Sequence, residues 1–396
     1  MAEEDGEGRR DVVTDVEQTG WLSRLGRSFA GVLFGFVMIA GAGVLLFWNE
    51  GRAITTARSL TEGSGVVRAV DAGRIDPAND GKLVHVADPI AVSGPVLDAE
   101  FGMRSNGLRL IRRVEMYQWT EEEVTETKRK LGGGEEKTTT YKYNRTWSDK
   151  PVDSAKFHER AGHANPQMTW RERNQLAAQP RIGAFAVPGG LLANFGAEQP
   201  LAANDDQSAA LKRKLDKSVQ VLDGVIYIAR DPAQPAVGDV RITYSEVPLQ
   251  DASVVARQAG STLAPYQTTA GGTIELIAAG VVPAAQMFKA AQDDNRLWTW
   301  LIRAGGCVLM FVGFGLIMGP LGVLGDVIPF IGDIVRAGTG LIGLLLTAVL
   351  APIVIAAGWL FYRPVVAVGI LVIGGIVAYA TIRIARQRRQ RQVAVA

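Results

Sequence analysis

The chain is poor in the residues from which most metal sites and many enzyme sites are built. Its 396 residues include one cysteine and three histidines. A lone cysteine, Cys307, excludes an intramolecular disulfide, so any folded domain depends on its core alone. No G-x-S-x-G motif, P-loop or dinucleotide fingerprint occurs. The net charge of +2 is far from the strongly basic charge that is typical of nucleic-acid-binding proteins. We therefore expect no cofactor and no nucleic-acid partner.

Long apolar segments, by contrast, are abundant. Four of them are long enough to cross a hydrocarbon core of about 30 Å as helices. They comprise residues 29–48, 297–324, 337–358 and 365–382. Core helices of soluble proteins carry polar residues at helical spacing, and the last two segments have no charged residue at all. The sequence therefore predicts an integral membrane protein with one N-terminal span and three C-terminal spans.

The polar region between the first two spans, residues 49–296, is predicted to be an α+β domain dominated by antiparallel sheet. Asp223-Gly224, between two β-branched runs, is a signal for a two-residue hairpin turn. The acidic and glycine-containing stretch 120–137 is expected to be a long solvated hairpin connection. The runs rich in β-branched and aromatic residues, which predict strands, are 82–86, 108–119, 138–147, 240–247 and 253–258.

Arginines at the ends of the spans predict the orientation. Arg24 and Arg27 precede the first span, and five arginines follow the last one. Because cytoplasmic flanks carry the excess of Lys and Arg, both termini are expected in the cytoplasm. The expected cytoplasmic segments are residues 1–28, 325–336 and 383–396. The segments expected outside the cytoplasm are the domain at 49–296 and the turn at 359–364.

Several motifs carry a resemblance to a known family. They are NEGRA at 49–53, VEMYQW at 114–119, Gly162-His163 with Asn165-Pro166, Asp326 with Pro329 and Asp333, and AGWLFYRP at 357–364. On these the chain resembles the transmembrane protein forty-three family, also called LUMA. The resemblance implies one N-terminal span, a large non-cytoplasmic domain and three C-terminal spans. It also implies a role in organising membrane protein complexes, and it carries over no catalytic residues.

Ten residues are candidates for structural or interaction roles. They are Glu50, Arg52, Glu115, Tyr117, Trp119, His163, Asp326, Asp333, Trp359 and Arg363. Glu50 and Arg363 are predicted to lie at one membrane depth. Either they form an ion pair, or Arg52 neighbours the same cluster. In a strand, Glu115, Tyr117 and Trp119 share one face. That face is either a ligand surface or, as we favour, the water-facing border of a sheet core.

His158, Glu159 and His163 resemble the zinc-protease motif H-E-x-x-H with one residue too many. At about 100° per residue, two histidines five positions apart point roughly 140° away from each other on a helix. His85 is the only further histidine, so we expect no metal site. His163 is instead expected to be a turn or cap residue whose ring is hydrogen-bonded.

Two features of the membrane region remain. Glycines recur at four-residue spacing, as Gly31 with Gly35 and as Gly315 with Gly319, which predicts close helix packing within homo-oligomers. Asp326 and Asp333 flank the turn between the second and third spans. An ion or proton role is possible there, but we favour N-capping of the following helix by Asp333.

Three functions stay open. The favoured one is a non-enzymatic scaffold that organises membrane protein or lipid complexes through its extracytoplasmic β-rich domain. Its partners would be membrane lipids, membrane proteins and copies of itself. The second is a membrane-bound enzyme acting on lipid or envelope substrates at the outer interface, using Glu50, Glu115, His163 or Arg363. The third is a transporter or channel. The third is disfavoured because no charged residue lies in the middle of a span. The expected location is a bacterial plasma membrane or, in a eukaryote, the endoplasmic reticulum or inner nuclear membrane.

Overall fold

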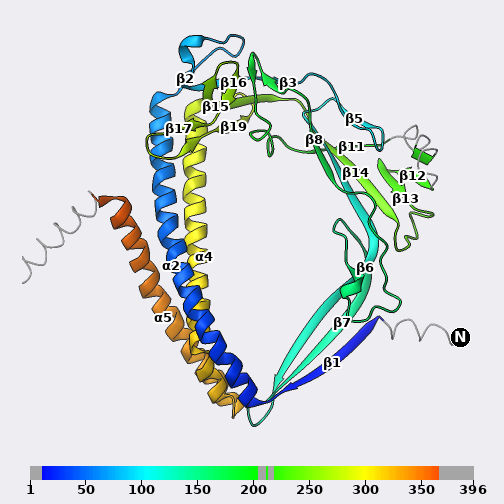
Figure 1. Cartoon of the computed structure of the whole chain (residues 1–396), viewed down its shortest axis with the longest axis vertical. Helices are drawn as coiled ribbons and strands as arrows, with labels where there is room; N and C mark the ends of the chain where they lie inside the picture. The colour runs from blue at the N-terminus through cyan, green and yellow to red at the C-terminus, as the bar shows by residue number, and fades with distance from the viewer. Residues whose placement is uncertain (1–10, 204–210, 213–217, 365–396) are drawn as a thin grey trace, which may run out of the picture. The chain divides into compact units, whose positions relative to one another are not determined.

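The computed structural model describes residues 11–203, 211–212 and 218–364. The chain forms two compact units, one rich in strands and one helical (Figure 1). The β-rich unit comprises Met1–Gln18, Ser59–Lys128 and Glu136–Ala291. The helical unit comprises Thr19–Arg58, Arg129–Glu135 and Gln292–Ala396. The fourth predicted span, residues 365–382, lies outside the described residues.

Three helices among the described residues are long and apolar enough to cross a membrane. They are α2 (Trp21–Val66), α4 (Ala284–Gly325) and α5 (Pro329–Tyr362). The chain is thus a multi-pass integral membrane protein with an α+β fold. Each helix is longer than the apolar segment that predicted it, because apolar composition ends at the membrane while helix formation continues. The last turns of α2 pack Leu60 against Phe288 at the start of α4, within the β-rich unit.

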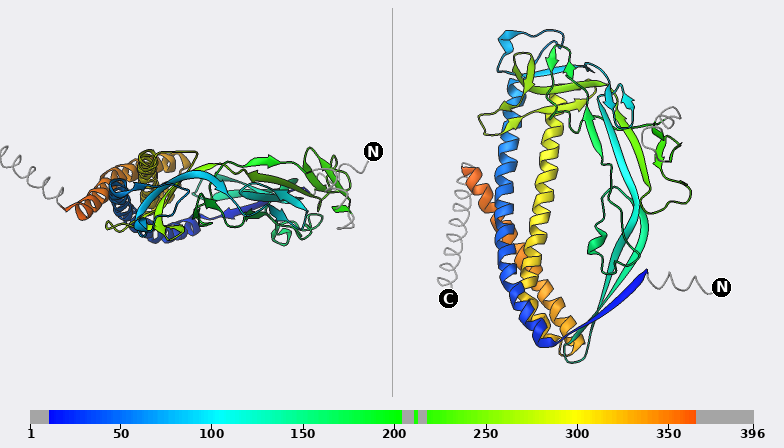
Figure 2. Two further views of the ribbon diagram at one scale, coloured as in Figure 1. Left: turned by 90° about the horizontal axis from the view of Figure 1, so that it is seen from above. Right: turned by 45° about the vertical axis from the view of Figure 1, so that its right-hand side comes forward.

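Glycine brings α2 and α4 into close contact along the apolar segments, where the two helices run side by side (Figures 1 and 2). A Cβ atom added at Gly35 would lie 2.6 Å from the carbonyl oxygen of Gly313. One added at Gly313 would lie 2.7 Å from Ile39, and one added at Gly306 would lie 2.6 Å from Leu46. Only glycine fits at these contacts, and the close approach favours dispersion between helices that have no hydrophobic driving force in lipid.

The larger sheet has eight strands, with the order β1-β7-β6-β14-β13-β12, while β8 pairs with β6 and β11 pairs with β14. Its strands are β1 (Val12–Thr19), β6 (Arg109–Arg129), β7 (Glu135–Ser148), β8 (Arg173–Leu176), β11 (Gln199–Leu201), β12 (Val219–Leu222), β13 (Val225–Ile228) and β14 (Val240–Val247). The predicted hairpin is confirmed, since Asp223 and Gly224 join β12 to β13 with φ of 51° and 77°. Strands β6 and β7 continue through most of the expected connection 120–137, where threonines and Val124 sustain the strand pattern, so the turn is limited to 130–134.

The smaller sheet has seven strands, in the order β19-β15-β16-β10-β9-β3-β2. Its strands are β2 (Arg68–Ala69), β3 (Leu83–Ala91), β9 (Arg181–Ile182), β10 (Phe185–Ala186), β15 (Asp251–Ala259), β16 (Thr262–Ala264) and β19 (Leu276–Ala279). Two short hairpins pair β4 (Val96–Asp98) with β5 (Met103–Ser105) and β17 (Tyr266–Gln267) with β18 (Thr273–Ile274). Fully buried side chains such as Val254, Ile182 and Phe185 form the core of this sheet.

Candidate functional site

The first group of charged residues, which we call the Glu50 cluster, joins all three described helices. It comprises Glu50 of α2, Arg303 of α4, and Trp359 with Arg363 at the end of α5. Arg303 donates two parallel hydrogen bonds to the Glu50 carboxylate, at 2.7 Å and 2.8 Å. The Trp359 indole donates a third at 2.8 Å. The Glu50 side chain is 1% exposed and that of Arg303 is 16% exposed, so the pair is shielded from water.

A polar network on the next turn of α2 continues this cluster. Arg52 donates to the side-chain oxygens of Asn49, Asn295 and Thr299, with distances from 3.1 Å to 3.4 Å. Asn49 in turn donates to the backbone carbonyl of Thr299 at 3.1 Å. Asn49 is fully buried, and Asn295 and Thr299 are nearly so. The network ties α2 to α4 and satisfies polar groups that would otherwise be costly to bury.

The predicted pairing of Glu50 with Arg363 is wrong. Glu50 binds Arg303, and the Arg363 guanidinium instead lies 4.8 Å above the ring of Trp359. The physical reason is the packing of α4 on α2, which brings Arg303 into bidentate contact with a carboxylate already buried by its neighbours. Glu50 and Arg363 do lie in one neighbourhood, because Trp359 contacts both the carboxylate and the Arg363 guanidinium. The alternative, in which Arg52 neighbours the same cluster, is observed, since Arg52 binds Asn49 next to Glu50.

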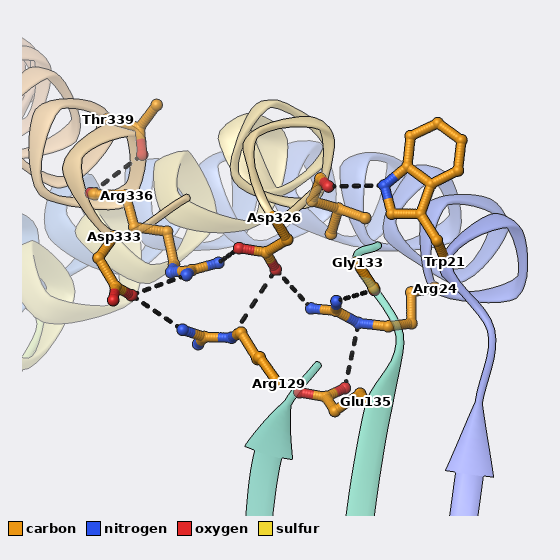
Figure 3. A network of polar contacts seen from close by, with 10 residues as sticks. Trp21, Arg24, Arg129, Gly133, Glu135, Asp326, Asp333, Arg336 and Thr339 are labelled. Atoms are coloured by element: carbon orange, nitrogen blue, oxygen red, sulfur yellow. Dashed lines mark hydrogen bonds and ion pairs between the residues drawn. The ribbon is translucent and has the colours of Figure 1, made fainter. Parts of the chain in front are cut away.

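The second group, which we call the Asp326 cluster, surrounds the connection between α4 and α5 (Figure 3). It comprises three arginines and three carboxylates: Arg24, Arg129, Arg336, Glu135, Asp326 and Asp333. Asp326 is at its centre, with a side chain that is 0% exposed. Its carboxylate accepts hydrogen bonds from Arg24 at 2.6 Å and from Arg336 at 2.5 Å, and Arg129 lies 3.7 Å away. These arginines come from α2, α5 and β6.

The two outer acids complete the Asp326 cluster. Glu135 lies 3.1 Å from Arg24, while Asp333 accepts from Arg129 at 2.9 Å and from Arg336 at 2.8 Å. Burial acts to raise the pKa of Asp326, but the hydrogen bonds and charges of the arginines outweigh it and hold that pKa below its usual value. Three positive and three negative groups therefore form a closed, charge-balanced network.

Asp333 is not the N-cap of α5, contrary to expectation. The helix begins at Pro329, and Ile328 occupies the N-cap position without a side-chain cap bond. Proline at the first helical position needs no hydrogen-bond acceptor for its nitrogen, so the helix starts without a capping carboxylate. Asp333, one turn further, is left to bind Arg129 and Arg336.

The two clusters lie at opposite ends of the apolar part of the helices. At 1.5 Å per residue, about 39 Å of α2 separates Arg24 from Glu50, and about 35 Å separates Arg303 from Asp326 along α4. These lengths match a hydrocarbon core of about 30 Å with a margin at each interface. Each cluster therefore ties the helices together at one membrane face.

The turn between β6 and β7 contacts the Asp326 cluster, and this contact bears on the expected topology. Residues 129–135 belong to the helical unit, and the backbone nitrogen of Gly132 donates to the carbonyl of Val327 at 3.1 Å. Charge patterning had placed 120–137 outside the cytoplasm and 325–336 inside it. Because groups in direct hydrogen-bond contact share one side of a membrane, labelling both segments tests these two predicted placements.

In the β-rich unit, the predicted shared face of Glu115, Tyr117 and Trp119 is observed. All three are half-buried, while the alternate residues of β6 are buried in the sheet core. Arg241 of β14 donates to Glu115 at 2.6 Å and 2.8 Å, and its guanidinium stacks over Trp147 at 4.8 Å. A cross-strand ion pair thus occupies the Glu115 carboxylate, as expected for the border of a sheet core.

His163 is a buried turn residue with a hydrogen-bonded ring, as predicted. Its side chain is 2% exposed, and its Nδ1 lies 3.1 Å from the carbonyl oxygen of Glu159. The ring stacks on Tyr143 and meets the edge of Trp119, with centroids 4.0 Å and 4.7 Å away. Burial and a hydrogen bond to Glu121 raise the pKa of Tyr143 to about 12. Within the described ranges, no three His, Cys, Asp or Glu side chains gather in a way that would hold a metal.

Arg303 and the residues of the Asp326 cluster other than Asp326 and Asp333 were missed as site residues. Arg303 lies in an otherwise apolar segment, and a charged residue in that position signals a buried partner. Arg336 directly precedes the apolar segment 337–358, and the same reasoning applied to it would have pointed to the Asp326 turn. Arg129 and Glu135 carried no such signal, because charged residues are ordinary in a hairpin.

Taken together, the helices and clusters define a class: a multi-pass membrane protein whose membrane helices are held together by a charged cluster at each end. The comparisons with known proteins place it further. The sequence model described as Transmembrane protein 43 matches residues 116–364, and the chain belongs to this family. The chain is 34% identical to Transmembrane protein 43 of Mus musculus over 95% of its length and 94% of the relative.

Two further relatives agree. Transmembrane protein 43 of Homo sapiens is 33% identical over 94% of this chain and 93% of its own length. The Transmembrane protein 43 homolog of Drosophila melanogaster is 30% identical over 86% of this chain and 91% of its own length. No solved structure matches the chain. These relatives are animal proteins, so the comparisons lend no support to the expected bacterial plasma membrane.

Proposed function

We propose that the chain is a non-enzymatic membrane scaffold that organises membrane protein complexes through its β-rich unit. The observation that carries this proposal is how the ionisable groups of the helical unit are used. Glu50 and Asp326 are each buried and each bound by arginine. Carboxylates bound in this way stabilise the arrangement of the helices. Their oxygens are occupied by arginine and are not available for acid–base chemistry.

The enzyme alternative loses its candidate groups for the same reason. Glu115 is bound by Arg241, and His163 is buried between aromatic rings. Glu50 belongs to the helical unit, whereas Glu115 and His163 belong to the β-rich unit, and no hydrogen bond between described residues joins Glu115 to His163. A nucleophile and a base within hydrogen-bond reach, as acyl or phosphoryl chemistry needs, are therefore not assembled from these residues.

The edge strand β1 supplies a surface on which a scaffold of this kind would bind partners. It lies at one end of the eight-stranded order, and none of the described strands pairs with its outer side. Its Val12 and Val16 are 47% and 58% exposed. An open edge with exposed valines is suited to the addition of a strand from another chain. We propose that partner proteins, or further copies of this chain, bind there.

Site-specific photocrosslinking in native membranes tests the proposal. A benzophenone amino acid at Val16 is expected to give discrete adducts of constant mass with one or a few membrane proteins or with the chain itself. The matched control is Leu97 of β4, which is 54% exposed but belongs to the separate β4–β5 hairpin and not to the eight-stranded sheet, and it is expected to give none. Adducts that are absent at Val16, or equal at both positions, would contradict the scaffold.

A further inference from the structure

A groove of about 370 Å³ lies between α2 and α4, at the end of the helices that carries the Asp326 cluster. Gly31, Gly315, Leu316 and Gly319 line its apolar part. Arg27 and Ser28 lie at its polar end. The groove is therefore apolar on one side and basic on the other, within a single helical unit.

The glycines of this groove differ from the glycines that pack α2 on α4. A Cβ atom at Gly35 or Gly313 would clash with the opposite helix. One added at Gly315 or Gly319 would meet no atom within 4 Å, and one added at Gly31 would meet only Leu316, at 3.9 Å. Gly315 and Gly319, which predicted helix packing from their spacing, are thus not used for packing between described helices. Their lack of side chains leaves the groove open beside the contact between α2 and α4.

The basic end of the groove carries one uncompensated charge. Arg24 is 9% exposed and is already bound by Asp326 and Glu135. Arg27 is exposed, and no described acidic side chain lies within 4.0 Å of it. Glu135 also lines the groove, but its charge is offset by Arg24 at 3.1 Å. An anion at the mouth would therefore meet the free guanidinium of Arg27.

The position along the helices sets the depth of this groove. Arg27 immediately precedes the apolar stretch of α2, so it lies at the membrane interface. From Val323 to Gly315 the groove extends about 12 Å along α4 into the apolar region. An occupant must be anionic at the interface and apolar below it. A further helix, with a diameter of about 10–12 Å, would lie across the opening of this groove without filling it. The charge of Arg27 would then have no counter-charge.

We propose that this groove binds an anionic phospholipid, with the headgroup phosphate at Arg27 and an acyl chain over Gly31, Gly315 and Gly319. Arginine forms strong, charge-assisted hydrogen bonds to phosphate oxygens. The Ser28 hydroxyl donates to the Leu25 carbonyl at 2.7 Å, so it meets the headgroup only as a second, weaker partner. Because the three glycines have no side chains, the groove has room along them for the methylene groups of an acyl chain. This lipid site does not depend on the proposed scaffold function.

Native mass spectrometry of the full chain released from nanodiscs tests the site. The nanodiscs contain phosphatidylcholine and phosphatidylglycerol at four to one, and the lipids retained per protein are counted. The wild type is expected to retain phosphatidylglycerol preferentially. Arg27→Gln should lower that retention about fivefold, the factor for one basic side chain at an anionic surface, without changing phosphatidylcholine. Gly315→Leu with Gly319→Leu should abolish retention by filling the groove.

Matched controls separate the groove from general effects. Arg296→Gln removes an exposed arginine at the other end of the apolar part of α4, and Gly340→Leu fills open space on α5; both should behave as wild type. Retention of the two lipids by the wild type in the four-to-one ratio of the nanodisc would overturn the proposal. So would an unchanged lipid count in the double leucine variant accompanied by loss of a dimer, because a second copy would then occupy the groove. If the leucine variant fails to fold, Arg27→Gln alone decides. Failure of the crosslinking test at Val16 would leave these lipid counts untouched.

Discussion

The Glu50 cluster and the Asp326 cluster tie the described helices together at their two ends, but they distribute charge differently. Glu50 has one arginine partner, Arg303, and one indole partner, Trp359. Asp326 lies within 4 Å of three arginines, and two of these are also bound by Asp333. A one-to-one buried pair fails when either member is lost, whereas a shared network retains partners for those that remain. Two carboxylates that are equally buried therefore differ in how strongly the protein depends on any one of their partners.

The largest expected effect is all-or-none. It concerns the side of the membrane from which a cysteine can be labelled. In a Cys307→Ser background, cysteines at Leu131 and Ile328 should both react with an impermeant maleimide from the same side of the membrane. A cysteine at Leu297, near the Glu50 cluster, should react only from the other side. These positions are 85%, 50% and 57% exposed. Labelling of Leu131 and Ile328 from opposite sides would separate the hairpin turn from the Asp326 cluster.

The next effect tests the one-to-one pair. Arg303→Ala leaves the Glu50 carboxylate buried without its cation, and the expected loss of stability is about 3–5 kcal/mol. Steric-trapping measurements of unfolding in detergent micelles would give the value. Arg363→Ala removes only a cation–π contact and should cost less than about 1 kcal/mol. A double-mutant cycle should couple Glu50 with Arg303 and not with Arg363. Coupling of Glu50 with Arg363 instead would restore the original prediction.

Asp326→Asn should cost less, about 2 kcal/mol. The substitution removes the shared acceptor, but Glu135 and Asp333 continue to compensate the arginines. Two of those arginines, Arg129 and Arg336, have side chains that are 35% and 31% exposed and can turn toward water. The same unfolding measurement applies. A loss as large as that of Arg303→Ala would show that the network shares its charge less than its geometry implies.

The pH dependence of this second effect has a definite sign. The folded-state pKa of Asp326 is depressed, so its contribution is fully present above the ordinary aspartate pKa of about 3.9 and is lost as pH falls through the lower folded value. The difference in unfolding free energy between wild type and Asp326→Asn should therefore be constant from pH 7 to about 5 and shrink below about 4. A difference that grows on acidification would contradict the depressed pKa.

The smallest effect is expected for the hairpin turn. Arg129→Ala removes a half-exposed member of the Asp326 cluster and should cost less than about 1 kcal/mol of global stability. It should nevertheless loosen the turn, because Arg129 also binds Asp333. Hydrogen exchange of the backbone amides at 130–134 should accelerate, with the remainder of β6 unchanged as the internal control. Unchanged exchange would mean that the backbone bond from Gly132 to Val327 holds the turn alone.

Local composition and periodicity were enough for several elements. Apolar runs predicted the three described membrane helices, because the length and composition of a span are properties of one continuous segment. Asp223-Gly224 predicted its hairpin, because the turn needs positive φ at both residues. Alternation along β6 predicted the shared face of Glu115, Tyr117 and Trp119. Local signals did less well at boundaries, since α2 and α4 continue past their apolar stretches as helices.

The pairing of charges, in contrast, depends on contacts between segments that are distant in the sequence. Glu50 and Arg303 are separated by 253 positions and Arg24 and Asp326 by 302. No sequence period links residues so far apart, and several arginines were available for each carboxylate. The choice came from close contact of glycines in α2 and α4, which aligned Glu50 with Arg303 and left Arg363 on the ring of Trp359. By contrast, hydrophobicity and motifs are read along the chain, so they identify a multi-pass membrane protein of one family without any tertiary information. The partners of its buried charges were decided by packing in three dimensions.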